Sequence, residues 1–239
     1  MNNIKIENLN IENIKIENPC IIKETNDYAV VFKPPKMHCA PGKYEYTLLD
    51  WYKANSHKVF DIMHRLDYET HGLVLFARNE KSFNFFKELQ DNGEFIKGYS
   101  AVCSNFDKLP IPELPHTIQS YFRSYGPGRK IVRPVTEIPE NNKRRKEIAK
   151  DKGGFYKTEI IDINNNVFTL QLKRGFRHQI RCHLCWIGFP ILNDPLYPQT
   201  ETAVNEESGQ KALALKAHAL YFADPVSGGR IECRIPPLE

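Results

Sequence analysis

Short apolar segments of the kind that form β-strands recur along this chain, and they outnumber the segments with helical periodicity. The spacing predicts strands at residues 28–32, 73–77, 99–103, 155–161, 167–172, 213–222 and 231–235. It predicts helices at residues 47–54, 79–91 and 176–187, whereas residues 104–152, rich in proline, glycine and charge, are expected to be irregular. Because the helices are not regularly interleaved with the strands, we expect an α+β fold with a mixed, largely antiparallel sheet core and flanking helices.

The length of 239 residues suits one domain with small additions. The pentapeptide Ile-Lys-Ile-Glu-Asn occurs at residues 4–8 and again at 14–18, with isoleucines two apart as in a half-buried strand. We therefore expect residues 1–19 to form an N-terminal extension, either a loose arm or a small hairpin. Residues 20–239 are expected to form the main domain.

Composition limits the class of protein. No apolar run is long enough to cross a bilayer, and the first residues are too polar for a signal peptide. The six cysteines are scattered, and we expect them to be reduced. These features predict a cytoplasmic monomer without membrane association. The net charge of +4 neither requires nor excludes nucleic acid.

A base, a cation and a carboxylate lie together in the connection before Gly72: His64, Arg65 and Asp67. Loops held by rigid elements often carry functional groups. The alternative is a structural turn in which Asp67 bonds to nearby backbone. On its own, the motif leaves these two interpretations about equally supported.

Two further segments strengthen the functional interpretation. Arg177 and Arg181, with His178 between them, are four apart on the expected helix and should share a face. The guanidinium of Arg181 is suited to a carboxylate or a phosphate, and a solvated cationic face is the alternative. Tyr99 opens an expected strand, where it is either half-buried core or a ring that meets a base.

Cys182, His183 and Cys185 resemble part of a zinc site. A structural zinc site needs four ligands, and no matching pair lies elsewhere in the chain. We therefore expect no metal, with the two cysteines as small core residues.

Several motifs in order resemble those of the RluA-type RNA pseudouridine synthases. Residues 64–73 look like the catalytic motif HRLD-x-x-T-x-G-L, and 97–99 like the K-x-Y motif. Residues 178–184 resemble the HQIR-x-H-L helix, and 188–197 the segment after it. The opening strand with its Lys-Pro turn and the chain's ending are similar too, so the resemblance covers roughly residues 20–237.

The resemblance implies isomerisation of a uridine in RNA, rRNA or tRNA, to pseudouridine. Asp67 would be the essential carboxylate at the ribose, either as a nucleophile at C1′ or as a base at C2′. Arg181 would be its cationic partner, Tyr99 would stack on the uracil, and Arg65 would help to hold the flipped nucleotide. No cofactor is implied, because nothing is oxidised and no group is gained.

One departure from the family concerns the start of the HQIR helix. The family often reads Gly-Arg-Thr-His-Gln there, whereas Phe176 stands at the arginine position in this chain and the cation moves to Arg177. A one-residue shift turns a helical side chain by about 100°. The resemblance therefore puts a phosphate contact of Arg177 in doubt, but not the role of Arg181.

The basic run Lys143, Arg144, Arg145 and Lys146 is either a solvated loop or a loop that grips RNA phosphates. His64 and His178 are further candidates for RNA contact. Two other functions compete with the synthase: a non-catalytic RNA-binding protein on the same scaffold, and a hydrolase that uses Asp67 with Glu69 and releases free uracil.

Overall fold

The computed structural model describes residues 17–42, 46–56, 58–104, 107–136, 155–197 and 212–238, together with the backbone of 5–8. The chain divides into two compact units, which we call unit 1 (Met1–Ser100 with Leu215–Leu238) and unit 2 (Ala101–Ala214). Among the described residues, no helix is long and apolar enough to span a membrane.

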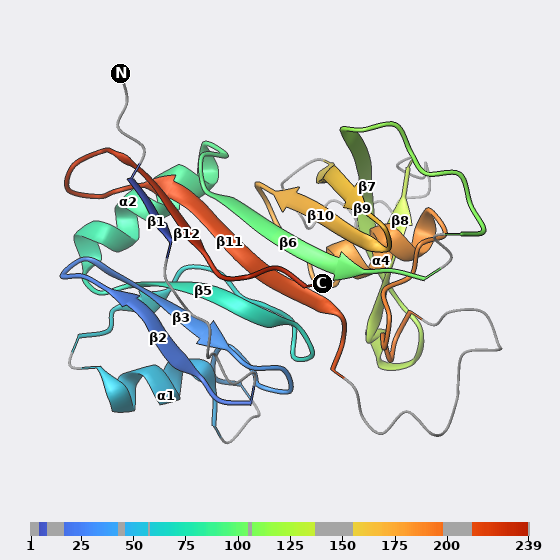
Figure 1. Cartoon of the computed structure of the whole chain (residues 1–239). Helices are drawn as coiled ribbons and strands as arrows, with labels where there is room; N and C mark the ends of the chain where they lie inside the picture. Colours follow the sequence, from blue (N-terminus) through green and yellow to red (C-terminus); the bar gives the residue numbers. More distant parts are fainter. Residues whose placement is uncertain are drawn as a thin grey trace, which may run out of the picture. The chain divides into compact units, whose positions relative to one another are not determined.

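Unit 1 is built on a mixed sheet (Figure 1). Neighbouring strands in order are β2 (Cys20–Glu24), β3 (Tyr28–Lys33), β5 (His71–Ala77), β11 (Leu215–Ala223) and β6 (Ile96–Val102). The short β4 (Asp61–Ile62) pairs with β5, and β12 (Arg230–Arg234) pairs with β11. The β2–β3, β3–β5 and β11–β12 pairs are antiparallel, whereas β11 runs parallel to β5.

Two helices complete unit 1, α1 (Leu48–Asn55) and α2 (Glu80–Asp91). Thr47 caps α1 in a reciprocal capping box with Asp50, and the Asn79 side chain caps α2. Both helices match the predicted ranges to within a residue, because cap residues and apolar spacing are local signals.

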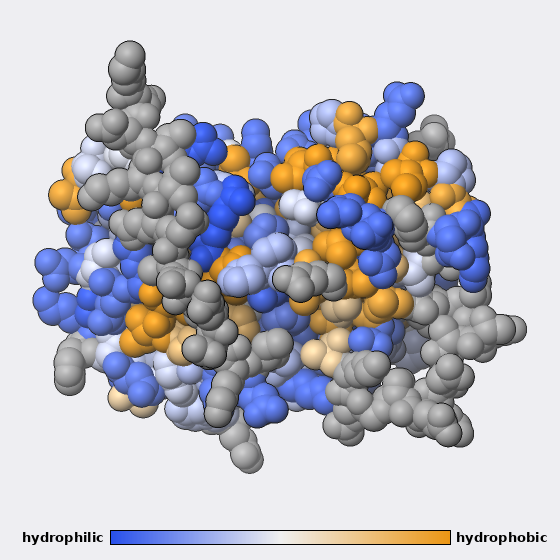
Figure 2. Space-filling view, viewed as in Figure 1, coloured by the Kyte–Doolittle hydropathy of each residue, from blue (hydrophilic) through white to orange (hydrophobic). Residues whose placement is uncertain are grey.

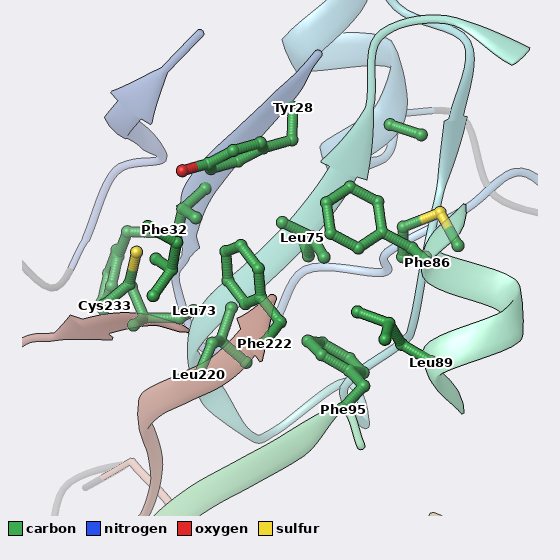
Figure 3. Packing of buried hydrophobic residues seen from close by; sticks show 14 of the residues in the cluster. Tyr28, Phe32, Leu73, Leu75, Phe86, Leu89, Phe95, Leu220, Phe222 and Cys233 are labelled. Carbon is green, nitrogen blue, oxygen red and sulfur yellow. The ribbon is translucent and has the colours of Figure 1, made fainter. Parts of the chain in front are cut away.

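The core of unit 1 lies between α2 and the sheet (Figure 3). Every residue of β3 and β5 is buried, as expected of central strands. Phe86 of α2 and Tyr28 of β3 each meet Phe222 of β11 edge-to-face, with ring centroids 5.5 and 5.2 Å apart. In the view of Figure 1, the surface over unit 1 is mostly hydrophilic, with separate apolar residues (Figure 2).

The N-terminal repeat has one described strand. Its first copy supplies β1 (Lys5–Asn8), which lies parallel to β12 in the register Lys5 to Ile231. The second copy lies mostly outside the described residues. Whether 1–19 is a separate extension of a domain at 20–239 stays a prediction.

Among its described residues, unit 2 holds a four-stranded antiparallel arrangement and a helix. The strands in order are β10 (Val167–Leu172), β9 (Tyr156–Asn164), β7 (His116–Tyr125) and β8 (Ile131–Val135). A 3-10 turn, η1 (Pro127–Arg129), joins β7 to β8, and α4 (Gln179–Trp186) contacts β8 and β9. The α+β class and the largely antiparallel sheet are thereby confirmed.

Two predictions for unit 2 were wrong. Residues 104–152 were expected to be irregular, but they contain β7 and β8. The helix predicted at 176–187 begins only at Gln179, because His178 takes a left-handed conformation with φ of 56°. Arg177 therefore precedes the helix, and the expected shared helical face with Arg181 does not exist.

A buried polar cluster joins α4 to the sheet of unit 2. The imidazole of His183 bonds to Ser120 Oγ at 2.9 Å through Nε2 and to Thr158 Oγ1 at 2.8 Å through Nδ1. All three residues are fully buried. Burial lowers the pKa of His183 to about 4, so the ring is neutral at pH 7.

This cluster predicts acid sensitivity of unit 2. The pKa of His183 is lowered in the fold, so the unfolded chain binds a proton more readily between pH 6.5 and 4, and stability falls as pH falls through that window. We expect His183 to contribute about 2 kcal/mol to the loss of stability between pH 7 and 4.5. Urea unfolding of His183→Gln should show a smaller pH dependence than the parent by that amount.

The measurement can be made specific to unit 2. Trp186 of α4 lies with its ring centroid 6.4 Å from that of His183, and Trp51 is the other tryptophan of the chain. A Trp51→Phe background leaves Trp186 fluorescence as the probe. Equal pH dependence in parent and variant would show that His183 titrates normally.

Candidate active site

Asp67 lies in the connection between β4 and β5, which we call the Asp67 loop (residues 63–70). Asp67 is half-buried, and its backbone carbonyl accepts a hydrogen bond from Thr70 N at 3.1 Å, which closes a turn. The loop ends at β5, where Gly72 lies against Ala217 of β11 with φ of 127°. A side chain at Gly72 would collide with the Ala217 backbone, which explains the glycine of the motif.

The peptide groups on both sides of Asp67 are held by the segment that follows β3. Leu66 N donates to Cys39 Sγ at 3.2 Å, and Cys39 Sγ donates to Leu66 O at 3.4 Å. Lys33 Nζ donates to Tyr68 O at 3.2 Å. Leu66 and Tyr68 are the two neighbours of Asp67, so its backbone is fixed on each side.

Lys33 also brings a buried positive charge to the Asp67 loop. The side chain is fully buried, and its ammonium group donates to the carbonyls of Pro34 at 2.8 Å and Met37 at 2.9 Å as well. Burial lowers the pKa of Lys33 to about 8, and the negative charges of Asp67 and Glu69 oppose that lowering. Lys33 is therefore mostly a cation at pH 7, and this cation lies within electrostatic range of the Asp67 carboxylate.

Tyr99 is electrostatically linked to Asp67. Its side chain lies on β6 and is 6% exposed. Burial raises the pKa of the Tyr99 phenol, and the negative charge of Asp67 raises it further. The hydroxyl therefore stays protonated near a carboxylate, where it can donate a hydrogen bond but is a poor base. Two of the predicted catalytic residues thus share one site in unit 1.

His64 and Arg65 occupy different environments on the Asp67 loop. His64 Nε2 accepts a hydrogen bond from Leu75 N at 3.1 Å, and the ring packs against Phe95. Burial and the charge of Lys97 lower the pKa of His64 to about 3, so the ring is neutral and ties the loop to β5. Arg65 is exposed, as a residue that contacts RNA should be. A contact of either residue with RNA stays a prediction.

Arg181 forms a bidentate ion pair within unit 2. Its Nε lies 2.8 Å from Asp194 Oδ2 and its Nη2 lies 2.6 Å from Oδ1, with both side chains buried. Asp194 also accepts from the backbone N–H groups of Leu196 and Tyr197. The guanidinium thus meets a carboxylate, one of the two predicted partner types. A role of Arg181 toward Asp67 stays a prediction.

Arg177 and His178 lie at the start of α4. Arg177 is exposed, and its Nη2 donates to Arg129 O at 2.7 Å and to Ser124 Oγ at 3.3 Å. His178 Nδ1 lies 3.3 Å from the Tyr197 hydroxyl. Lys143, Arg144 and Arg145 lie outside the described residues.

The two cysteines of α4 pack in a hydrophobic cluster of unit 2. Cys182 is buried and its Sγ donates to Val132 O at 3.4 Å, whereas Cys185 is half-buried. In the part of the chain that the structure describes, no group of three or more His, Cys, Asp or Glu side chains is placed to hold a metal ion.

Sequence reasoning missed Lys33 and Cys39 at the Asp67 loop of unit 1, and it missed Asp194, the partner of Arg181 within unit 2. Sequence patterns indicate Lys33 only as part of a Lys-Pro turn, and Asp194 only as part of segment 188–197, which is similar to the family's. Lys33 and Cys39 reach the Asp67 loop across 35 and 27 positions of sequence, and no local pattern announces such contacts.

Three comparisons with known proteins bear on the family and the fold of the chain. The family model described as RNA pseudouridylate synthase matches residues 27–186. An "Uncharacterized RNA pseudouridine synthase" of Helicobacter pylori is 26% identical over 237 residues, and another of Bacillus subtilis, YlyB, is 28% identical over 229. The alignments cover 92% and 90% of this chain, and 66% and 68% of those relatives. The chain thus spans about two thirds of their length.

The fold is also found in solved structures. The human RNA Pseudouridylate Synthase Domain Containing 1 matches with a TM-score of 0.66 and 20% identity, covering 94% of this chain and 86% of that chain. Domain Containing 4 matches with a TM-score of 0.64 and 17% identity, covering 92% and 88%.

The two-way contact between Cys39 and Leu66 gives a test of the loop geometry. Cys39→Ala and the volume-matched Cys39→Val remove both hydrogen bonds, whereas Cys39→Ser keeps a donor and an acceptor. We expect faster amide hydrogen exchange at Leu66 and a stability loss of about 1–3 kcal/mol in the first two variants. Serine should preserve most of the protection. Equal protection of Leu66 in all four proteins would show that the thiol does not hold the loop.

Proposed function

The chain belongs to the RNA pseudouridylate synthase family, and we propose that it isomerises a specific uridine of structured RNA, rRNA or tRNA, to pseudouridine. The observation that carries the proposal is the environment of Asp67. This carboxylate has its backbone fixed on both sides, the cation of Lys33 near it, and a protonated Tyr99 within its field.

The reaction breaks the N1–C1′ bond of uridine and joins C5 of the same uracil to C1′. The proton on C5 is lost and N1 gains one, so the product is an isomer and needs no oxidant, metal or organic cofactor. Asp67 acts at the ribose, either by attacking C1′ or by removing the C2′ proton. Both routes start from the carboxylate form of Asp67, and the cation of Lys33 lies near it.

Tyr99 serves the base rather than the sugar in this proposal. Its ring offers a stacking surface for uracil, and its protonated hydroxyl can donate a hydrogen bond to a uracil carbonyl. Arg181 completes the catalytic set as the arginine of the family motif. The buried pair with Asp194 fixes the geometry of its guanidinium.

Access to C1′ and C5 requires that the uridine leave its stack. We propose that Arg65 and His64 at the Asp67 loop, and Arg177 and His178 at the start of α4, help to hold the flipped nucleotide. The basic run at 143–146 is proposed to add phosphate contacts. The protein is expected to act as a cytoplasmic monomer.

Asp67→Asn removes the charge while keeping the size of the side chain. We expect loss of pseudouridine formation by at least about 10³-fold, with RNA binding and thermal stability close to the parent. Carbodiimide mapping of pseudouridine in RNA treated with the purified full chain measures the first, and anisotropy measures the second. Glu69→Gln is the matched control, because Glu69 is the neighbouring carboxylate and should retain activity.

The outcomes separate the competing functions. Full activity in Asp67→Asn would refute the proposed mechanism. Release of free uracil by the parent would identify a hydrolase. RNA binding without any conversion, in parent and variant alike, would identify a non-catalytic RNA-binding protein.

A further inference from the structure

The sheet of unit 2 has two faces of opposite character. Side chains on one face are buried, among them Ser120 and Phe122 of β7, Thr158 of β9 and Val132 of β8. This is the face of the His183 cluster and so of α4. Alternation along each strand sends the intervening side chains to the opposite face.

We call the second set the aromatic–basic face. It consists of Tyr121, Arg123, Tyr125, Arg133, Phe155 and Lys157. The registers place Arg123 opposite Arg133 and Tyr121 opposite Val135, and Lys157 opposite Gln119, two residues before Tyr121. All six side chains are exposed or half-buried, and Tyr125 and Phe155 are 37% and 42% exposed.

The rings and cations of this face are interleaved. The guanidinium of Arg133 lies 3.3 Å from the centroid of the Tyr125 ring. The rings of Tyr121 and Phe155 lie 4.3 Å apart at 30°. Aromatic surface therefore flanks the arginine pair on both sides.

The charge on this face is unbalanced. Like charges directly opposite each other on neighbouring strands are unfavourable, yet Arg123 faces Arg133. Residues 116–136, which span β7 and β8, contain no Asp or Glu. Glu159, opposite Thr117, and Asp162, opposite Thr169, are the acidic residues that the registers of β9 place on this side. An anionic partner would offset the repulsion.

The combination of rings and cations selects among anionic partners. Phosphates of a nucleic-acid backbone match the cations, and unpaired bases can stack on the exposed rings. A duplex keeps its bases stacked internally, and a peptide of acidic residues offers no aromatic rings to stack on those of the protein. We propose that the aromatic–basic face binds an unpaired stretch of the substrate RNA, a role that rests on the proposed function and adds a binding surface on unit 2.

The test measures binding apart from chemistry. In the Asp67→Asn background, anisotropy of labelled twelve-nucleotide oligouridylate is followed from 50 to 300 mM KCl, with a blunt twelve-base-pair RNA duplex and polyglutamate as competitors. Arg123→Gln with Arg133→Gln should weaken binding about ten-fold or more and reduce the salt slope by about 1.4, for two lost phosphate contacts. Tyr125→Ala should weaken binding about ten-fold with an unchanged slope.

The matched control is Lys87→Gln with Lys108→Gln, which removes the same charge from exposed residues elsewhere. Its affinity should stay within two-fold of the parent. Equal losses in control and arginine variants, or no loss in either, would overturn the inference. Tighter binding of the duplex or of polyglutamate than of the oligouridylate would overturn it as well.

The measurements distinguish a failure of the proposed function from a failure of the proposed binding surface. If the parent forms no pseudouridine but the arginine variant loses oligouridylate binding, the proposed function fails and the binding surface stands. If the parent forms pseudouridine and the arginine and tyrosine variants bind oligouridylate as the parent does, the surface fails and the proposed function stands.

Discussion

The candidate site depends on the hydrogen bonds and the positive charge of the Lys33 ammonium group. It lies at the end of β3, a fully buried strand, and reaches the Asp67 loop through Tyr68 O. A buried cation is costly unless its donors are satisfied, and three carbonyls accept from this one. The pKa of Lys33 is lowered, so these hydrogen bonds offset only part of the free-energy cost of burying its charge. The loop is therefore tied to the core through a charge that also acts on Asp67.

Fixing the loop through its backbone has a chemical consequence. Cys39 and Lys33 bind peptide groups of Leu66 and Tyr68, so the Cα of Asp67 is positioned without using its carboxylate. Preorganisation of this kind lowers the entropic cost of reaching a reactive geometry.

Local signals in the sequence predicted most elements of unit 1, but not the strands β2 and β4. The apolar runs of β3 and β5 and the caps at Thr47 and Asn79 are strong because each depends on adjacent residues. In the site, motifs could indicate Asp67 and Tyr99 as a pair. They could not indicate Cys39, since its partner Leu66 is distant in sequence and the contact exists only after β3 and β5 have paired.

Unit 2 was harder to predict because its buried face is partly polar. In β7, Ser120 stands where an apolar residue would complete the alternation of Ile118 and Phe122. Its hydroxyl is buried because His183 of α4 bonds to it, a partner 63 residues away. The predicted start of α4 was wrong for a different reason, because the spacing of apolar residues does not indicate the left-handed backbone at His178.

The same polar cluster determines which side of β7 faces outward. A slip of one residue in the β7–β9 pairing would turn Ser120 and Phe122 to the surface and Tyr121 and Arg123 into the core. That slip would leave His183 without its hydroxyl partner on β7 and would bury a guanidinium. Gln179 reinforces the register, because its Nε2 donates to both Lys157 O and Thr158 Oγ1. Buried polar contacts on the α4 side thus enforce the display of rings and cations on the other.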